Sequence, residues 1–207
     1  MDKIFIEAQY KKTSEFNFIH TVVSKHFPGK EDGIVCMGGV DKLFNEAILN
    51  NIRQTQDEGG KALVLVDADF PSKGWGFSAR QHDVLSKMSS HEVVFPLFIY
   101  PNNKDDGDVE TLMESLARKD LHQEWWDCFE DYETCVKGAK DKTGNYKYNL
   151  PNRKAKLHTY ISSQMLCKKK REKLGEGNWL FDDSDYWDLS RCELKPLLDF
   201  FATNLSC

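Results

Sequence analysis

The first hundred residues alternate short apolar runs with amphipathic segments, and this alternation constrains the fold more than any other feature of the chain. The run at 62–66 is continuously apolar, as expected of a parallel strand that is covered on both faces. The repeated pattern predicts an α/β fold with a mostly parallel sheet and helices on both of its faces. The expected strands are residues 3–7, 34–37, 62–66 and 92–99, and the expected helices are 13–27, 41–58 and 78–88.

Beyond residue 100 the pattern changes to loops and helices, which predicts a helical C-terminal extension. Helices are expected at 108–116, 121–136, 152–170 and 191–205, with a polar loop at 138–151 and one further short strand at 178–181. We expect residues 1–120 to form the α/β core and residues 121–207 to pack on that same core, giving a single domain overall.

The composition excludes several classes of protein. The chain has 207 residues, 40% of them hydrophobic and 29% charged, which is ordinary for a folded globular domain. No apolar run is long enough for a membrane span, and the N-terminus does not resemble a signal peptide, so a cytoplasmic location without membrane contact is expected. A Walker loop and a Gly-x-Gly-x-x-Gly motif are both lacking, which argues against a nucleotide cofactor.

The cysteines give no sign of a metal centre. They form no Cys-x-x-Cys pair and have no histidine neighbours at the spacing of zinc ligands. In a reducing compartment they are expected to act as small buried hydrophobic residues, except for Cys207, which is expected in an exposed tail. The six positions are Cys36, Cys128, Cys135, Cys167, Cys192 and Cys207.

Charge is distributed unevenly along the chain. The formal net charge is −5, yet residues 153–173 hold eight Lys or Arg and a single Glu. Such a stretch could attract a polyanion, or it could simply be the solvated face of a helix. The first alternative predicts nucleic-acid contacts at Arg153, Lys168, Lys169, Lys170 and Arg171.

Acidic residues follow three of the four predicted strands. Glu7 follows the first, Asp67 and Asp69 follow the third, and a group of acids at 105–110 follows the fourth. The carboxyl ends of parallel strands form the ligand-binding edge of an open α/β sheet. Converging carboxylates repel one another unless a cation neutralises them, and their oxygens suit Mg²⁺ or Mn²⁺. Each acid also has a structural alternative, since Asp108 is well placed to cap the next helix.

These acids resemble a known pattern. Glu7, the glycines at 38–39, the Asp-Ala-Asp at 67–69 and the Asp-Gly-Asp-Val-Glu at 106–110 are similar to the Toprim fold of topoisomerases, primases and the overcoming-lysogenization-defect nucleases. A closer resemblance covers nearly the whole chain and is to a bacterial Toprim-like family of unknown function. It is carried by residues 4–7, 66–71, 101–103, 150–156 and 178–182.

The resemblance implies a metal-dependent nuclease. It implies that one or two Mg²⁺ or Mn²⁺ ions are held by Glu7, Asp67, Asp69, Asp108 and Glu110. It further implies that Lys154 or Lys156 faces the scissile phosphate of DNA or RNA. Because Toprim nucleases often act beside an ATPase, a separate protein partner is also implied.

Two positions depart from the Toprim pattern, which has Glu-Gly-x-x-Asp after the first strand. This chain has Ala8 in place of the glycine and Lys11 in place of the second acid. Losing that acid would weaken one metal position, and Lys11 could instead pair with Asp67 or Asp69. The alternative function is therefore a non-catalytic module that binds nucleic acid or a protein. A receiver-like phosphoacceptor domain fits less well, because it needs two acids after the first strand and a fifth strand bearing a lysine.

Overall fold

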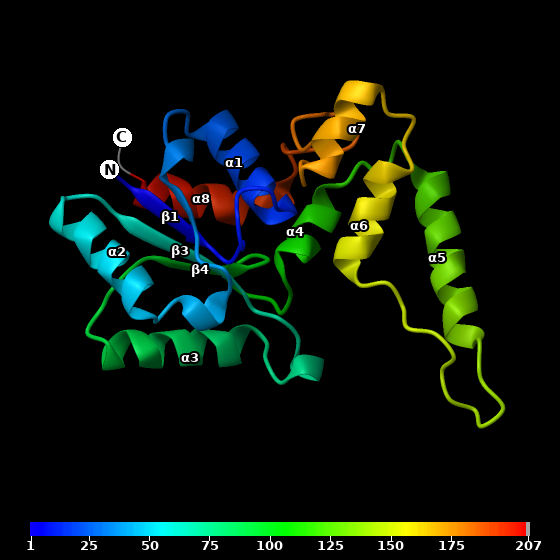
Figure 1. Cartoon of the computed structure of the whole chain (residues 1–207), viewed down its shortest axis with the longest axis horizontal. Coiled ribbons are helices and arrows are strands. Elements are labelled where there is room, and N and C mark those ends of the chain that lie inside the picture. Colours follow the sequence, from blue (N-terminus) through cyan, green and yellow to red (C-terminus); the bar gives the residue numbers. More distant parts are fainter. Residues whose placement is uncertain (206–207) are drawn as a thin grey trace.

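The computed structural model describes residues 1–205, and Cys207 lies outside the described residues. Its centre is a sheet of four strands, all parallel, in the order β2-β1-β3-β4 (Figure 1). The predicted parallel α/β sheet is confirmed. The strands are β1 (Lys3–Ile6), β2 (Ile34–Cys36), β3 (Ala62–Asp67) and β4 (Leu97–Tyr100).

Helices cover both faces of the sheet, as the βαβ pattern predicts (Figure 1). Side chains of β3 alternate between the two faces, with Leu63 and Leu65 in one core and Val64 and Val66 in the other. This two-sided burial explains why residues 62–66 of the strand are all apolar. One face packs against α2 (Glu46–Asp57) and α3 (Phe77–Ser90), and the other against α1 (Ser14–His26) and α8 (Lys195–Asn204).

The C-terminal part lies beyond the carboxyl ends of the strands and then returns to the sheet (Figure 1). One cluster of buried side chains includes Ile4 of β1, Leu157 of α6 and Phe201 of α8. The extension is therefore continuous with the core on one face of the sheet. Its helices, together with the helix that follows β4, are α4 (Val109–Leu116), α5 (Gln123–Gly138), α6 (Arg153–Ser162) and α7 (Lys168–Gly175).

Four short 3-10 helices complete the secondary structure of the described residues. They are η1 (Glu31–Gly33), η2 (Val40–Lys42), η3 (Pro71–Lys73) and η4 (Cys192–Leu194). Among residues 1–205, no helix combines the length and apolar character that crossing a bilayer requires.

Several expected boundaries were wrong. The fourth strand begins at Leu97 rather than at residue 92, because Pro96 has no N–H to donate, although its carbonyl accepts a hydrogen bond from Val64. The helix expected at 152–170 is two helices, α6 and α7, separated by residues 163–167. The segment 178–181 is not a strand, since its apolar residues pack into the core from irregular backbone.

The cysteines were also expected to be buried, and most are not. Cys36 is half-buried, whereas Cys128, Cys135, Cys167 and Cys192 are exposed. Cys128 and Cys135 are exposed because they lie on α5, which is the outermost helix and buries only Trp126 and Phe129.

We expect Phe181→Ala to destabilise the whole protein. Phe181 is 1% exposed, and its ring lies 5.2 Å from that of Phe18 on α1 and 4.8 Å from that of Trp187. The expected loss is about 3–5 kcal/mol in the free energy of unfolding, measured by urea denaturation. As a control, the fully exposed Met165 can be replaced by Ala with an effect within about 0.5 kcal/mol. An unchanged midpoint for Phe181→Ala would show that this segment unfolds separately from the sheet.

Candidate functional site

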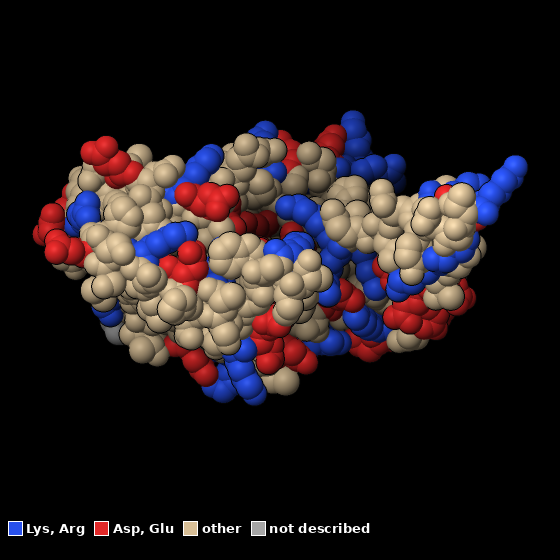
Figure 2. Space-filling view, turned by 90° about the horizontal axis from the view of Figure 1, so that it is seen from below, with Lys and Arg blue, Asp and Glu red and all other residues tan. Residues whose placement is uncertain are grey.

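A cavity of about 520 Å³ lies where β1 and β3 end and where α4 and α6 begin. Figure 2 shows acidic side chains at the bottom of a central hollow, with lysine and arginine side chains around it. Six of the residues predicted from the sequence line this cavity: Glu7, Asp67, Asp108, Glu110, Arg153 and Lys154. The structure thus brings together acids that lie more than one hundred positions apart in the chain.

Glu7 is held by the ends of two neighbouring chain segments. Its Oε1 accepts a hydrogen bond of 2.7 Å from the backbone N–H of Asp67, and its Oε2 accepts one of 3.2 Å from that of Val40. Burial raises the pKa of Glu7, while these hydrogen bonds and the charge of Arg80 oppose that rise. The side chain is therefore fixed in place, and each oxygen keeps a further lone pair for a ligand.

Asp67 ends β3 and faces the first turn of α4. Its Oδ1 accepts a hydrogen bond of 2.8 Å from the backbone N–H of Val109, at the positive end of the helix dipole. Within residues 1–205, no hydrogen bond reaches its Oδ2. Burial raises the pKa of Asp67 well above its usual value, and the nearby carboxylates of Glu7, Glu15 and Glu110 raise it further.

Glu15 belongs to the same cavity, and the sequence analysis missed it. It lies in the first turn of α1, is 9% exposed, and accepts a hydrogen bond of 3.0 Å from the backbone N–H of Glu7. Burial and the charges of Glu7 and Glu110 raise its pKa to about 8. An acid in a first helical turn is usually explained by the helix dipole. The overlooked signal is its spacing from Ile19 and Val22, which places Glu15 on the buried face of α1.

Glu110 and Asp108 occupy the start of α4 but have different environments. Burial raises the pKa of Glu110, and the ammonium of Lys154, 3.6 Å away, opposes that rise. Asp108 is the N-cap of the helix and forms a capping box with Thr111. Its Oδ1 also lies 3.1 Å from the guanidinium of Arg153. Asp108 therefore caps α4, as the structural alternative predicts, and it also lines the cavity.

Asp69 does not line the cavity. Its backbone has a φ of +60° and exchanges two hydrogen bonds with Gly107, which turns the chain away from the direction of Asp67. Its carboxylate lies 3.1 Å from Arg80 and 3.0 Å from Lys73. The structure thus separates the two acids of the Asp-Ala-Asp motif.

Arg80 is a second residue that the sequence analysis missed. Its side chain is 4% exposed, stacks at 4.0 Å on the ring of Trp75, and donates from Nε to the backbone carbonyl of Asp67. It therefore places a fixed positive charge behind the acidic cavity.

Lys11 is not among the acids. It is exposed, and its ammonium lies 5.9 Å from the centre of the Phe16 ring. Lys73 and Arg80 are the cations that contact Asp69 instead. Ala8 is buried and lines the cavity, and its carbonyl accepts a hydrogen bond from Gly38.

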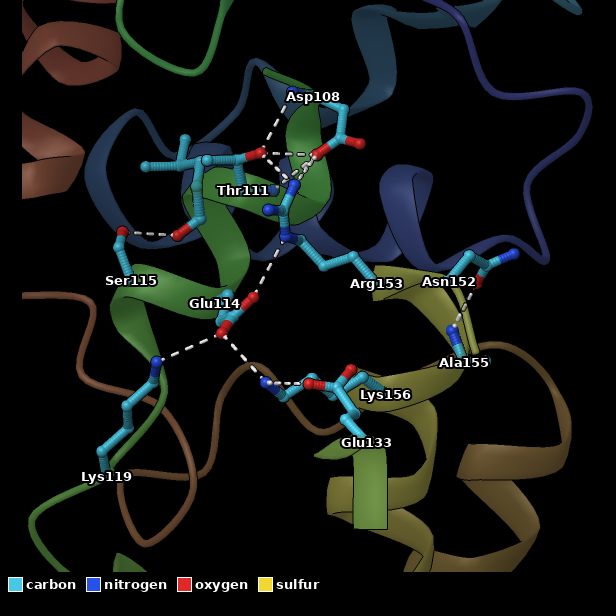
Figure 3. Close-up of polar contacts among 11 residues, drawn as sticks. Asp108, Thr111, Glu114, Ser115, Lys119, Glu133, Asn152, Arg153, Ala155 and Lys156 are labelled. Carbon is cyan, nitrogen blue, oxygen red and sulfur yellow. Dashed lines mark hydrogen bonds and ion pairs between the residues drawn. The ribbon is translucent and has the colours of Figure 1, made fainter. Parts of the chain in front are cut away.

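The two candidate lysines occupy different places, and Figure 3 shows one of them, Lys156, beside Glu114 and Glu133. Lys156 is 12% exposed and lies 3.6 Å from Glu114 and 3.9 Å from Glu133, away from the cavity wall. Lys154 is 55% exposed and lines the cavity. Of the two, only Lys154 is positioned to meet a phosphate bound there.

Arg153 connects the cavity to the extension (Figure 3). Its guanidinium contacts Asp108, Thr111 and Glu114, each at 3.1 Å or less. The remaining predicted basic residues, Lys168, Lys169, Lys170 and Arg171, lie on α7 outside the cavity wall. Three of them already have internal partners. Lys170 lies 2.6 Å from Asp183, Arg171 donates to the carbonyl of Leu166, and Lys168 lies 3.9 Å from Glu172.

The oxygen donors of the cavity suit a divalent cation, but they do not form a ready-made cage. In the part of the chain that the structure describes, no group of three or more His, Cys, Asp and Glu side chains has the arrangement of a metal site. Mg²⁺ commonly uses only one or two protein carboxylates and completes its shell with water and substrate phosphate. The buried carboxyl groups of Glu7 and Asp67, both with raised pKa, fit that smaller requirement.

Comparison with known proteins identifies the family but not the activity. The model of a family described as a protein of unknown function, DUF3226, matches residues 2–205. The chain belongs to this family. No curated protein and no solved structure matches it.

We expect Glu15→Gln to flatten the pH dependence of stability. The pKa of Glu15 is about 8 in the folded protein, against a usual value of 4.5. The folded state therefore holds a proton that the unfolded chain has lost, so stability falls as pH rises from about 4.5 to 8. Gln keeps the acceptor for Glu7 and removes this proton. Urea denaturation at several pH values measures the slope, and equal slopes in both proteins would contradict the assignment.

We expect replacement of the two lysines to lower stability by different amounts. Lys156→Met removes a nearly buried ammonium from Glu114 and Glu133, and we expect a loss of about 1–3 kcal/mol in the free energy of unfolding. Lys154→Met removes an ion pair in which the lysine is 55% exposed, and we expect a loss of about 1 kcal/mol or less. Thermal and urea denaturation compare the two variants. A larger loss of stability for Lys154→Met would contradict the assignment of the structural role to Lys156.

Proposed function

We propose that this protein carries out phosphodiester chemistry on nucleic acid with one bound Mg²⁺ or Mn²⁺ ion, as a Toprim-like nuclease. The observation that supports this most is the cavity itself, where four carboxyl groups with raised pKa meet a rim that carries Lys154 and Arg153. Acidic oxygens would attract the cation, and the basic rim would attract the phosphate. The resemblance of Glu7 and the 67–69 and 106–110 motifs to Toprim proteins supports the same proposal.

Glu7 and Asp67 are the residues that would hold the ion, and Glu110 lines the same cavity beside them. Their carboxyl groups are desolvated, and a divalent cation would replace the protons that their raised pKa values favour. When bound, such an ion supplies charge stabilisation at a phosphate oxygen. Glu15 keeps the backbone of Glu7 in position, and Lys154 would offset negative charge that develops on the phosphate.

One ion is proposed rather than two. Asp69 already has two cationic partners in Arg80 and Lys73, so it lacks the free negative charge that a second divalent ion would require. At position 11, where the Toprim pattern has an acid, this chain has an exposed lysine.

A second candidate function is a non-catalytic module that binds nucleic acid or a protein partner. It is favoured by the pairing of Asp69 with cations of the chain itself and by the lack of a ready-made metal cluster within residues 1–205. In this case Arg80 and Lys73, rather than a metal, would balance the acids.

Calorimetric titration of Mn²⁺ into the metal-stripped protein separates the two candidates. We expect one ion to bind per chain, and Asp67→Asn to weaken binding more than ten-fold because it removes the ligand with a free oxygen. Asp69→Asn and Asp105→Asn are matched controls. Each removes one carboxylate near the same edge of the sheet but outside the cavity wall, so each should leave the affinity within about three-fold.

Each other result has a defined meaning. Two bound ions would contradict the single-ion proposal. If Asp67→Asn leaves the affinity for Mn²⁺ unchanged, the ion does not bind at Asp67. No binding by the wild-type protein would reject the metal-dependent function and favour the non-catalytic module.

A further inference from the structure

A basic hairpin, residues 137–150, starts in the last turn of α5 and leads to α6, and it lies at the lower right of Figure 1. Its two sides pair at Lys140 and Tyr146. Asp141 closes the turn, since its carboxylate accepts hydrogen bonds from the backbone N–H groups of Thr143 and Asn145. The hairpin therefore has a defined turn and pairing of its own.

The hairpin carries a net positive charge. It carries four lysines at positions 137, 140, 142 and 147, and its single acid is Asp141. The carboxylate of Asp141 is engaged within the turn. The lysines have no acidic partner among the ion pairs of residues 1–205. Such a surface favours a polyanion.

Two tyrosine rings accompany these lysines. Tyr146 is 70% exposed and Tyr148 is 54% exposed, although rings of this size are usually at least partly covered. The ammonium of Lys140 lies 2.9 Å from the centre of the Tyr146 ring, and that of Lys147 lies 5.3 Å from that of Tyr148. Beside them is a hollow of about 300 Å³, lined by Lys137, Tyr146, Tyr148, Asn149 and Leu150. Exposed rings interleaved with cations are the usual means of binding unpaired bases.

The hairpin leads directly into the acidic cavity. Arg153 comes only five positions after Tyr148, a span of at most about 18 Å. Asn152, Arg153 and Lys154 line the cavity. A strand that lay along the hairpin would therefore arrive at the side of the cavity where phosphate contacts are proposed.

We propose that the basic hairpin binds a single strand of nucleic acid, with bases stacked on Tyr146 and Tyr148 and phosphates held by its lysines. A duplex does not fit this surface as well, because its bases are already stacked on each other and leave no free face for a tyrosine ring. This proposal rests on the proposed function in one respect, namely that the ligand is a nucleic acid. It requires no metal and no cleavage.

Fluorescence anisotropy with a labelled oligothymidylate and the full-length protein, in EDTA, tests this. We expect each of Tyr146→Ala and Tyr148→Ala to weaken binding about five-fold or more, as the loss of one stacked base requires. Tyr146→Phe and Tyr148→Phe keep a ring and should bind like wild type. Lys142→Ala and Lys147→Ala should each reduce the magnitude of the negative slope of log K against log salt by about 0.7.

Matched controls separate this surface from general effects. Tyr132→Ala removes an exposed ring of α5 outside the hairpin, and Lys61→Ala removes an exposed lysine at the start of β3. Both should leave binding unchanged. Tighter binding of a duplex of the same length, equal losses in the controls, or no binding by the wild type would each overturn the proposal.

The outcome is independent of the metal test. Asp67→Asn should bind the oligonucleotide in EDTA as wild type does. Oligonucleotide binding without Mn²⁺ binding would reject the metal-dependent function and keep the hairpin. Mn²⁺ binding with unchanged oligonucleotide affinity in the tyrosine variants would reject the hairpin proposal and keep the metal-dependent function.

Discussion

The carboxylate of Glu7 joins the chain segments at the carboxyl edge of the sheet. It accepts hydrogen bonds from the backbone of Asp67 and Val40, while its own backbone N–H donates to Glu15. Parallel strands leave unpaired backbone groups where they end, and these groups must find partners when loops cover them. Glu7 supplies such partners at the ends of two neighbouring segments. The position of the acids in the cavity therefore depends on the same bonds that close the sheet edge.

This arrangement brings negative charges together at a cost that the surrounding cations partly offset. Burial raises the pKa of Glu7, Asp67 and Glu110, and the carboxylates of Glu7 and Glu110 raise the pKa of Asp67 further. Arg80 lies behind the cavity and Lys154 at its rim. Native proteins keep such unfavourable clusters mainly where function requires them, so the cluster itself is the strongest reason to expect a ligand.

The strand ends were predictable from the sequence because parallel strands deliver their last residues to one edge. That rule brought Glu7, Asp67, Asp108 and Glu110 together correctly. It failed for Asp69, because a single residue with positive φ redirects the chain and the sequence gives no warning of it. It also missed Glu15 and Arg80, which lie on helices, where burial depends on how the helix packs. The two lysines could not be told apart from sequence for the same reason, since Glu133 comes from another helix.

The C-terminal extension supplies the basic residues at the rim of the cavity. The sheet provides acids, whereas the residues that could meet a phosphate, Arg153 and Lys154, begin α6. Arg153 also contacts Asp108 and Glu114 of α4, so the position of α6 is fixed relative to the acids by charge as well as by packing. A rotation of α6 would break these contacts and remove the positive rim at the same time. Acidic and basic halves of the site are thus assembled only when the extension is folded against the core.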